Sequence, residues 1–189
     1  MEKPAGARDR ILETAYELFS RDGIRAVGID RVVAEARVAK MTLYHHFPSK
    51  DELVLAFLDL REQRWTLDWL CAEIERTDPA TGDRLLALFD ALDGWFHAPD
   101  FESCPFIRTL LEAPERSASA HEAAVRHMDV VRQMIERHAG ESGASPAADV
   151  SYQLQILMMG AIVSATRGDL DAARRVRPVA ERLVGDART

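Results

Sequence analysis

Three observations on the sequence predict an all-α protein of about nine helices. Apolar residues recur three and four positions apart along most of the 189-residue chain, which is the spacing of helices with one buried face. No segment alternates apolar and polar residues as a half-buried strand would. Glycine and proline stand between the periodic segments, where they end helices.

The N-terminal part of the chain is predicted to form three short helices around a small core. The first ends at Gly23, the second runs from Ile29 to Ala36, and the third stops before Pro48. Only three residues join the last two, as in a helix-turn-helix, whose second helix enters the major groove of DNA. We therefore assign residues 1–49 to a helix-turn-helix domain. Its expected core is Ile11, Ala15, Leu18, Phe19, Ile29, Val32, Val33, Ala36, Val38, Leu43 and Phe47.

The short third helix carries polar side chains that no core requires, and such groups can hydrogen-bond to base edges and phosphates. The capping box Ser49–Glu52 starts the next helix and places Lys50 in a first turn, where free N–H groups attract a phosphate. We expect Lys40, Met41 and Thr42 to face bases. We expect Tyr44, His45 and Lys50 to contact phosphates. The candidate DNA-binding residues are Arg37, Lys40, Met41, Thr42, Tyr44, His45, His46 and Lys50.

The same segment resembles a known family. The run VAKMTLYHHFPSKDEL, residues 38–53, is similar to the signature of the TetR family of bacterial repressors, and residues 11–23 resemble its first helix. The likeness covers roughly the first 57 residues and continues more loosely at 104–106 and 159–161. It implies a DNA-binding transcriptional regulator rather than an enzyme, which acts as a homodimer on a near-palindromic operator. It also implies a ligand-binding and dimerisation domain over residues 50–189.

Several positions depart from the family pattern. Arg37 stands where the turn usually has glycine, Ala39 where a Ser or Thr cap is usual, and Met41 where glycine is common. The second helix usually opens with Thr or Ser, but the sequence there is Val27-Gly28. The phosphate contacts of those hydroxyl groups are therefore in question. Arg37 either replaces one of them or is a solvated turn residue, and the sequence leaves both readings open.

Charge is distributed unevenly along the chain. The net charge is −7, yet residues 1–50 hold nine Lys and Arg against seven Asp and Glu, whereas residues 51–189 hold 15 against 24. A mildly basic head on an acidic body orients the head toward DNA and limits nonspecific binding. The charged N-terminus is unlike a signal peptide, and no apolar run approaches the ~20 residues that span a bilayer. We expect a cytoplasmic protein without a membrane partner.

The body is predicted to contain six further helices. A capping box at Ser119–Glu122 should start one of them, and Pro178 should kink or split the last. The expected segments are about 50–75, 85–96, 105–114, 119–140, 145–168 and 169 to the C-terminus.

The helix expected at 145–168 is unusually apolar. Between Leu154 and Val163 only Gln155 is polar, so this helix must be covered on more than one side. Small residues four positions apart allow another helix to approach closely. The cover is either a second subunit or the rest of the same chain. The family resemblance favours the subunit, with a dimer interface formed by the last two helices. The candidate interface residues are Leu154, Leu157, Met158, Gly160, Ala161, Ser164 and Ala165.

The resemblance also implies a small-molecule effector that releases the protein from DNA. Such pockets are mostly apolar with a few polar groups, so we expect a largely apolar or aromatic effector. His127 and Gln155 are the candidate polar anchors. Each apolar candidate has ordinary core packing as its alternative role. The candidate ligand-binding residues are Trp65, Trp69, Trp95, Phe96, Phe101, Phe106, His127, Met128, Met134, Gln155 and Met159.

Other functional classes have weaker support in the sequence. There is no phosphate-binding glycine loop, nucleophile elbow or zinc-binding helix motif, so we predict no catalytic residues, cofactor or metal site. A structural helical adaptor is the third alternative, but it does not explain the polar third helix. Cys71 and Cys104 are expected to be small buried residues, with a redox-sensing pair as the alternative.

Overall fold

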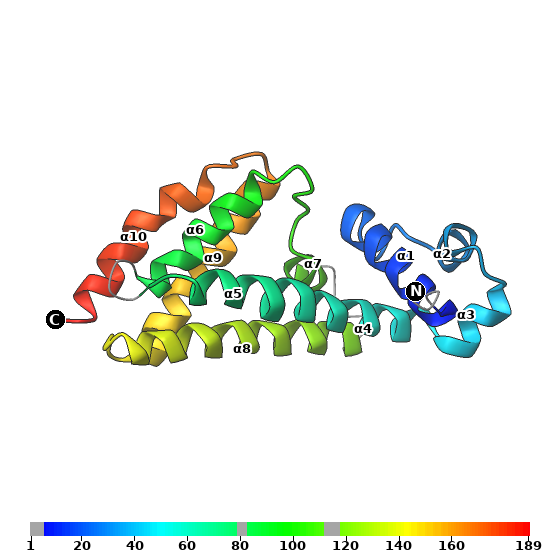
Figure 1. The fold of residues 1–189 in the computed structure, drawn as a ribbon, viewed down its shortest axis with the longest axis horizontal. Helices are drawn as coiled ribbons and strands as arrows, with labels where there is room; N and C mark the ends of the chain where they lie inside the picture. Colours follow the sequence, from blue (N-terminus) through cyan, green and yellow to red (C-terminus); the bar gives the residue numbers. More distant parts are fainter. Residues whose placement is uncertain (1–5, 79–82, 112–117) are drawn as a thin grey trace. The chain divides into compact units, whose positions relative to one another are not determined.

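The computed structural model describes residues 6–78, 83–111 and 118–189, and in these segments the regular structure is entirely helical (Figure 1). The all-α prediction is confirmed. If the unbroken run from α4 through η1 to α5 is counted once, the described segments contain the nine helices expected. The helices are α1 Ala7–Asp22, α2 Ile29–Ala36, α3 Lys40–His46, α4 Lys50–Arg61, η1 Glu62–Leu70, α5 Cys71–Glu75, α6 Arg84–Phe96, α7 Pro105–Leu111, α8 Ala118–Glu141, α9 Ala147–Thr166 and α10 Ala172–Asp186.

The chain divides into two compact units. The first contains residues 1–63 and 105–125, and the second contains residues 64–104 and 126–189. This division by packing differs from the predicted functional boundary after residue 49, because α4 packs with α1 and belongs to the first unit. The boundary between a DNA-binding domain and a ligand-binding domain stays a prediction.

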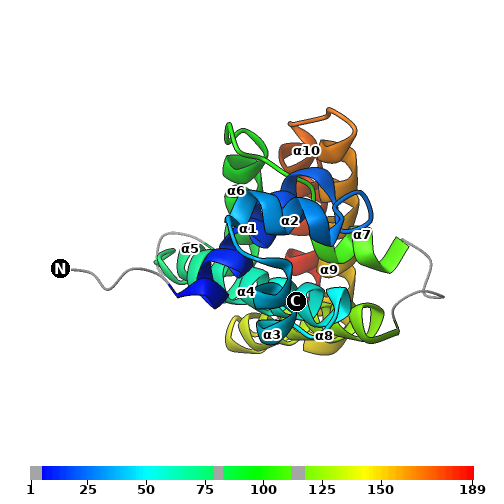
Figure 2. The ribbon, with the colours of Figure 1, turned by 90° about the vertical axis from the view of Figure 1, so that its right-hand side faces the viewer.

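The core of the first unit lies among α1, α2, α3 and α4, and Figures 1 and 2 show the first three of these helices next to one another. Ile11, Val32 and Leu43 are completely buried, as their spacing predicted. The ring of Phe57 from α4 packs edge-on against that of Phe19, with 5.4 Å between the centroids. Burial of such a side chain stabilises the fold by about 1.5–3 kcal/mol. This core fixes the orientation of the very short helix α3, which could not be stable by itself.

In the second unit α10 lies along both α6 and α9 (Figure 1). Leu88 and Leu92 of α6 are buried, as are Leu154 and Ile162 of α9. Small side chains on α10, including the fully buried Ala173 and Ala180, allow the helices to approach closely. Ion pairs lie at the edge of this contact, such as Arg177 with Asp90, whose closest atoms are 2.7 Å apart.

The predicted helix at 50–75 is continuous, but its middle is a π-helix. Residues Glu62–Leu70 form η1 between α4 and α5. A π-helix is rare and widens the turn, and short stretches of it occur frequently at functional sites. The apolar spacing of the sequence could not reveal it, because the change in period extends over only nine residues. The segment carries Trp65 and Trp69.

One expectation about the helices of the body is wrong, and another is wrong in part. Ser119 lies within α8, which already includes Ala118, so its side chain does not occupy the N-cap position. Pro178 lies inside α10, which continues from Ala172 to Asp186, so the expected split is wrong, whereas the alternative of a kink stays a prediction. The expected end of another helix at Pro114 falls outside the described residues.

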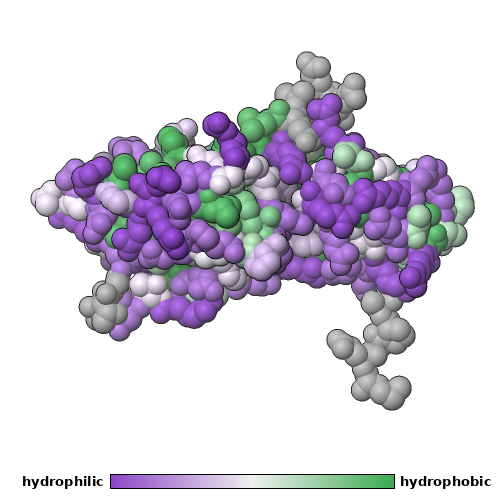
Figure 3. All heavy atoms as spheres, turned by 90° about the horizontal axis from the view of Figure 1, so that it is seen from above, coloured by the Kyte–Doolittle hydropathy of each residue, from purple (hydrophilic) through white to green (hydrophobic). Residues whose placement is uncertain are grey.

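No helix in the described part of the chain is long and apolar enough to cross a membrane. The face drawn in Figure 3 is mostly hydrophilic, with hydrophobic residues in smaller areas among the hydrophilic ones.

Candidate functional sites

Helix α3 has one buried and one exposed side. Leu43 and Phe47 are 0% and 3% exposed and hold the helix against the core, as predicted. Residues two positions before and after Leu43 lie about 200° around the helix axis from it. Met41 and His45 therefore point away from the core, and Met41 is 80% exposed. Tyr44 is exposed on the flank of this face, while Thr42 and His46 are half-buried.

The turn between α2 and α3 depends on Arg37. This residue has φ 53° and ψ 50°, the left-handed conformation that costs a non-glycine residue about 1–2 kcal/mol. Its backbone N–H donates to the Ala34 carbonyl, and that of Val38 donates to the Val33 carbonyl at 3.3 Å. The departure from glycine noted in the sequence therefore introduces backbone strain. The exposed guanidinium projects from the turn that precedes α3.

Lys40, the first residue of α3, forms an ion pair that the sequence did not predict. Its ammonium lies 2.7 Å from a carboxylate oxygen of Asp30 in the first turn of α2. The hydrogen bond from this carboxylate raises the pKa of Lys40. Both side chains are largely exposed, so the pair contributes little to stability but orients the ammonium. This ion pair forms because the N-termini of α2 and α3 approach each other in space. Residue spacing along the sequence does not reveal that approach.

Lys50 has a structural role that the sequence reasoning missed. Its ammonium donates to the carbonyl oxygen of Ile24 at 2.7 Å and lies 6.0 Å from the centre of the Phe19 ring. The side chain thus ties the start of α4 to the loop after α1. The capping prediction for Ser49 is confirmed, since its hydroxyl accepts from the N–H of Glu52 at 3.1 Å. A lysine ammonium has three donors, so the expected phosphate contact of Lys50 stays a prediction.

Gly23 ends α1 at a position that another helix approaches. Its φ of +87° favours glycine, and its N–H donates to the Phe19 carbonyl at 3.0 Å. A Cβ atom at this position would lie 2.5 Å from the Arg108 guanidinium. Arg108 belongs to α7, which is part of the same unit. Sequence reasoning identified the cap but not the arginine beside it.

Five of the predicted ligand-binding residues form one aromatic cluster in the second unit. The rings of Trp65 and Trp95 are the closest pair, with centroids 4.7 Å apart. The centroid of Phe101 lies 4.9 Å from that of Trp95 and 5.3 Å from that of Phe96. Trp69 joins through Trp65 at 5.3 Å. The cluster therefore connects the π-helical segment, α6 and the residues that follow α6.

Two buried polar atoms of η1 are unsatisfied, one of them on a residue of this cluster. The indole nitrogen of Trp65 and the hydroxyl of Thr66 have no hydrogen-bond partner among the described residues. Thr66 is 0% exposed. An unsatisfied buried donor costs about 1–3 kcal/mol, so such groups are usually paired with protein, water or ligand. Sequence reasoning missed Thr66, because a threonine in a helix ordinarily bonds to the preceding turn.

The remaining ligand-binding candidates have different environments. The Gln155 amide is buried and donates to the carbonyl oxygen of Met128 at 2.6 Å, so one of its hydrogen bonds is already satisfied within the protein. His127 is 2% exposed, and Met159 is half-buried. Phe106 is buried in α7, which belongs to the first unit.

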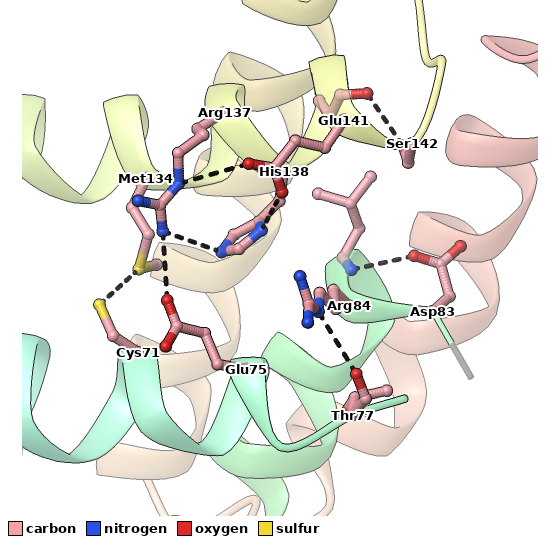
Figure 4. Close-up of polar contacts among 12 residues, drawn as sticks. Cys71, Glu75, Thr77, Asp83, Arg84, Met134, Arg137, His138, Glu141 and Ser142 are labelled. Atoms are coloured by element: carbon pink, nitrogen blue, oxygen red, sulfur yellow. Dashed lines mark hydrogen bonds and ion pairs between the residues drawn. The ribbon is translucent and has the colours of Figure 1, made fainter. Parts of the chain in front are cut away.

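Met134 and Cys71 meet at one side of a polar network in the second unit (Figure 4). The Cys71 thiol lies 3.2 Å from the Met134 sulfur, and burial raises the pKa of that thiol. Arg137 bridges Glu75 and the neighbouring His138, whose ring contacts Glu141 at 3.3 Å. Burial, and then the charge of Arg137, lower the pKa of His138. A thiol with a raised pKa is a poor nucleophile, which argues against the redox alternative for Cys71.

One group in the second unit has the composition of a metal site. Ligand atoms of Asp93, His97 and Asp171 all lie within 4.8 Å of one another. Arg174 already lies 2.9 Å from Asp93 and 3.1 Å from Asp171. Its guanidinium supplies the positive charge that the carboxylates would otherwise need. We therefore interpret these three residues as part of the polar contact between α6 and α10 rather than as a metal site.

The exposed face of α9 does not coincide with most of the predicted interface residues, whose role in a dimer stays a prediction. Leu154, Met158, Ala161 and Ala165 are buried within the single chain, Leu157 and Ser164 are half-buried, and Gly160 is exposed. The exposed apolar residues of the helix are Tyr152, Ile156 and Val163, at 60%, 57% and 41%. With Gly160 they recur every three to four positions and define one stripe, here called the α9 stripe.

Comparisons with known proteins match the segment of the first unit that contains α2 and α3. A family profile described as bacterial regulatory proteins of the tetR family matches residues 11–57. The transcriptional regulator QacR of Staphylococcus aureus is 34% identical over 68 residues, which cover 36% of this chain and 36% of that protein. The regulator SrpR of Pseudomonas putida is 30% identical over 144 residues, 74% of this chain and 63% of that protein. The chain thus spans less than two thirds of these curated relatives.

A solved structure covers far more of the chain. The regulator SCO4454 of Streptomyces coelicolor, described as TetR-family, has a TM-score of 0.86 at 27% identity and covers 97% of this chain and 96% of its own. A second regulator, from Streptomyces avermitilis, has a TM-score of 0.83 at 28% identity and covers 97% and 98%. Both units therefore have counterparts in solved structures described as TetR-type transcriptional regulators.

Proposed function

Because this chain belongs to the TetR family of bacterial DNA-binding regulators, we propose that it is a ligand-responsive transcriptional repressor. It binds a near-palindromic operator as a dimer, and a small, largely apolar or aromatic effector releases it. The observation that carries this proposal is the exposed outer face of α3 on a rigid three-helix core. Neither an enzyme nor a structural adaptor would need such a face.

The DNA-binding step follows from the placement of α3. Tyr44 and His45 offer hydrogen-bonding groups outside the core, and Arg37 projects a cation from the turn before the helix. A recognition helix of this kind reads bases with its N-terminal residues and is positioned by phosphate contacts. Two copies of α3, one DNA turn apart, would read the two halves of one operator.

The dimer step is supported by the α9 stripe. Tyr152, Ile156 and Val163 leave apolar surface in water in one protomer. Gly160 in their midst has no atom within 4 Å of the position its Cβ would take, so a partner helix could approach closely there. Exposed apolar stripes of this kind mark protein interfaces. We therefore propose an interface centred on the α9 stripe, and Gly160 is common to the stripe and to the residues expected from the sequence.

The effector step is supported by the aromatic cluster and by the two unsatisfied buried groups of η1, on Trp65 and on the adjacent Thr66. Trp65, Trp95 and Phe101 offer apolar ring surface, and the Thr66 hydroxyl offers an unused hydrogen bond. An effector with a ring and one polar substituent matches both features. By linkage, it must lower operator affinity by the same factor as operator lowers effector affinity, typically about 5–150-fold.

Selection of bound fragments from genomic DNA, followed by gel shift, tests the proposal. A repressor of this kind selects a short near-palindrome and binds it as two subunits per site. Recovery of fragments with no shared sequence would contradict specific operator binding. A selected operator bound by one subunit would contradict the dimer alone. Titration of candidate aromatic compounds, read by tryptophan fluorescence with and without operator, tests the release step.

A further inference from the structure

Met41 is an unusual residue to expose at the start of a recognition helix. It is 80% exposed, the largest fraction recorded for a large hydrophobic side chain in the described parts of the chain. It also points almost directly away from buried Leu43, as the helical angle of about 200° requires. The residue therefore lies at the outermost line of α3 and in its first turn. If α3 enters the major groove as proposed above, first-turn residues meet the base edges.

The chemistry of this side chain limits what it can recognise. A thioether has no hydrogen-bond donor and is only a weak acceptor, so it cannot make the paired hydrogen bonds that identify guanine or adenine. Among unmodified bases the major groove offers one apolar group, the C5 methyl of thymine. Methionine is flexible and polarizable, and it adapts its shape to a methyl surface.

None of the polar residues near Met41 occupies the same outward position in the first turn of α3. Lys40 directs its ammonium to the Asp30 carboxylate at 2.7 Å, toward α2. Thr42 is half-buried, and the next outward residue, His45, lies one turn further along the helix. The outermost point of the first turn is therefore apolar.

We infer that Met41 is a specificity-determining residue that reads the C5 methyl of one thymine in each operator half-site. This inference rests on the proposed operator binding and adds the chemical group that is recognised. Removal of one buried methyl group weakens binding by about fourfold. For a dimer that reads two half-sites, the loss is roughly 15-fold when both methyl groups are removed.

Replacement of thymine by deoxyuridine tests this reading, because it removes the methyl group and keeps every hydrogen-bonding group. The operator selected from genomic DNA is synthesised with each symmetric pair of thymines replaced in turn. Affinities are measured by fluorescence anisotropy at one fixed salt concentration, since phosphate contacts make affinity depend on salt. The proteins are the full-length chain and its Met41→Ala and Met41→Leu variants. Both substitutions lie at an exposed position, so the fold is retained, and circular dichroism checks this.

The inference predicts one thymine pair whose replacement weakens binding of the unaltered protein by about 15-fold. The Met41→Ala variant should bind the thymine and deoxyuridine operators equally, whereas Met41→Leu should keep most of the difference. Equal binding of all substituted operators by the unaltered protein would overturn the inference and leave operator binding intact. Full discrimination in Met41→Ala would also overturn it. Failure to select any common sequence would instead remove the proposed function, and the inference with it.

Discussion

Helices α3 and α9 both present a free face, but only the face of α3 could be located from the sequence. Leu43 in α3 and Phe47 directly after it mark the buried side, and the other residues of α3 are polar apart from the exposed Met41, so the contrast defines the outer face. In α9 nearly every residue from Leu154 to Val163 is apolar. The sequence could show that such a helix is covered on several sides, but not which side its own protomer covers. A functional face is visible in sequence where polar and apolar residues alternate with the helical period.

The most severe test of this comparison is a charge in the α9 stripe. Gly160→Arg places a cation where one protomer has open space, so the monomer should fold while the dimer loses several kcal/mol of stability. Sedimentation should show folded monomers, and operator affinity should fall by at least two orders of magnitude. Ala161→Arg should instead unfold the protomer, because Ala161 is 1% exposed.

Gly94→Arg is the matched control for this experiment. Gly94 is also an exposed helical glycine with no atom near its Cβ position, but it lies on α6. This variant should remain as dimeric as the unaltered protein. A dimer that survives Gly160→Arg would place the interface away from the α9 stripe.

The tie made by Lys50 should matter for the stability of the DNA-binding head. Lys50→Met keeps the aliphatic stem over Phe19 but leaves the Ile24 carbonyl without its donor. We expect the free energy of unfolding to fall by about 1–2 kcal/mol in urea titrations. If Lys50 also contacts a phosphate, the slope of log affinity against log salt should decrease by about one. Unchanged stability would show that the bond to Ile24 is dispensable.

Release of the backbone strain at Arg37 should have a smaller effect on stability. Arg37→Gly removes the left-handed penalty but makes the unfolded chain more flexible, so stability should rise by only about 0.5–1 kcal/mol. Arg37→Ala keeps a Cβ atom and should leave stability unchanged. Equal melting temperatures for the two variants would argue that the turn is not strained. The two variants also test whether the Arg37 guanidinium contacts DNA. If it does, both Arg37→Gly and Arg37→Ala should bind the operator more weakly.

The order of the helices and the core of the first unit were predictable because local spacing determines them. Other features depend on contacts between segments distant in sequence, such as Lys40 with Asp30, Lys50 with Ile24 and Arg108 near Gly23. A sequence pattern does not register such contacts. The π-helical turns around Trp65 escaped prediction for a different reason, since apolar spacing barely changes over nine residues. Pro178 shows that a helix held along its length by tertiary packing tolerates a residue that usually breaks it.

The smallest expected effect concerns pH and the second unit alone. Burial lowers the pKa of His138, so the native protein releases this proton at a lower pH than the unfolded chain does. Its contribution to stability is therefore complete above the ordinary pKa of about 6.5 and is lost as pH falls toward the native value. Urea titrations across this range should show unfolding free energy decreasing with acidity. His138→Gln should flatten this dependence. A decrease in this variant as steep as that in the unaltered protein would exclude His138 as the cause.

The central claim is that the outer face of α3 reads DNA, and the affinity of a double variant tests it most directly. Tyr44→Ala with His45→Ala removes two hydrogen-bonding side chains outside the core, so the melting temperature should stay the same. Affinity for the selected operator should fall by roughly tenfold or more. Operator affinity equal to that of the unaltered protein, with the fold intact, would contradict the account and place the DNA contact on another surface.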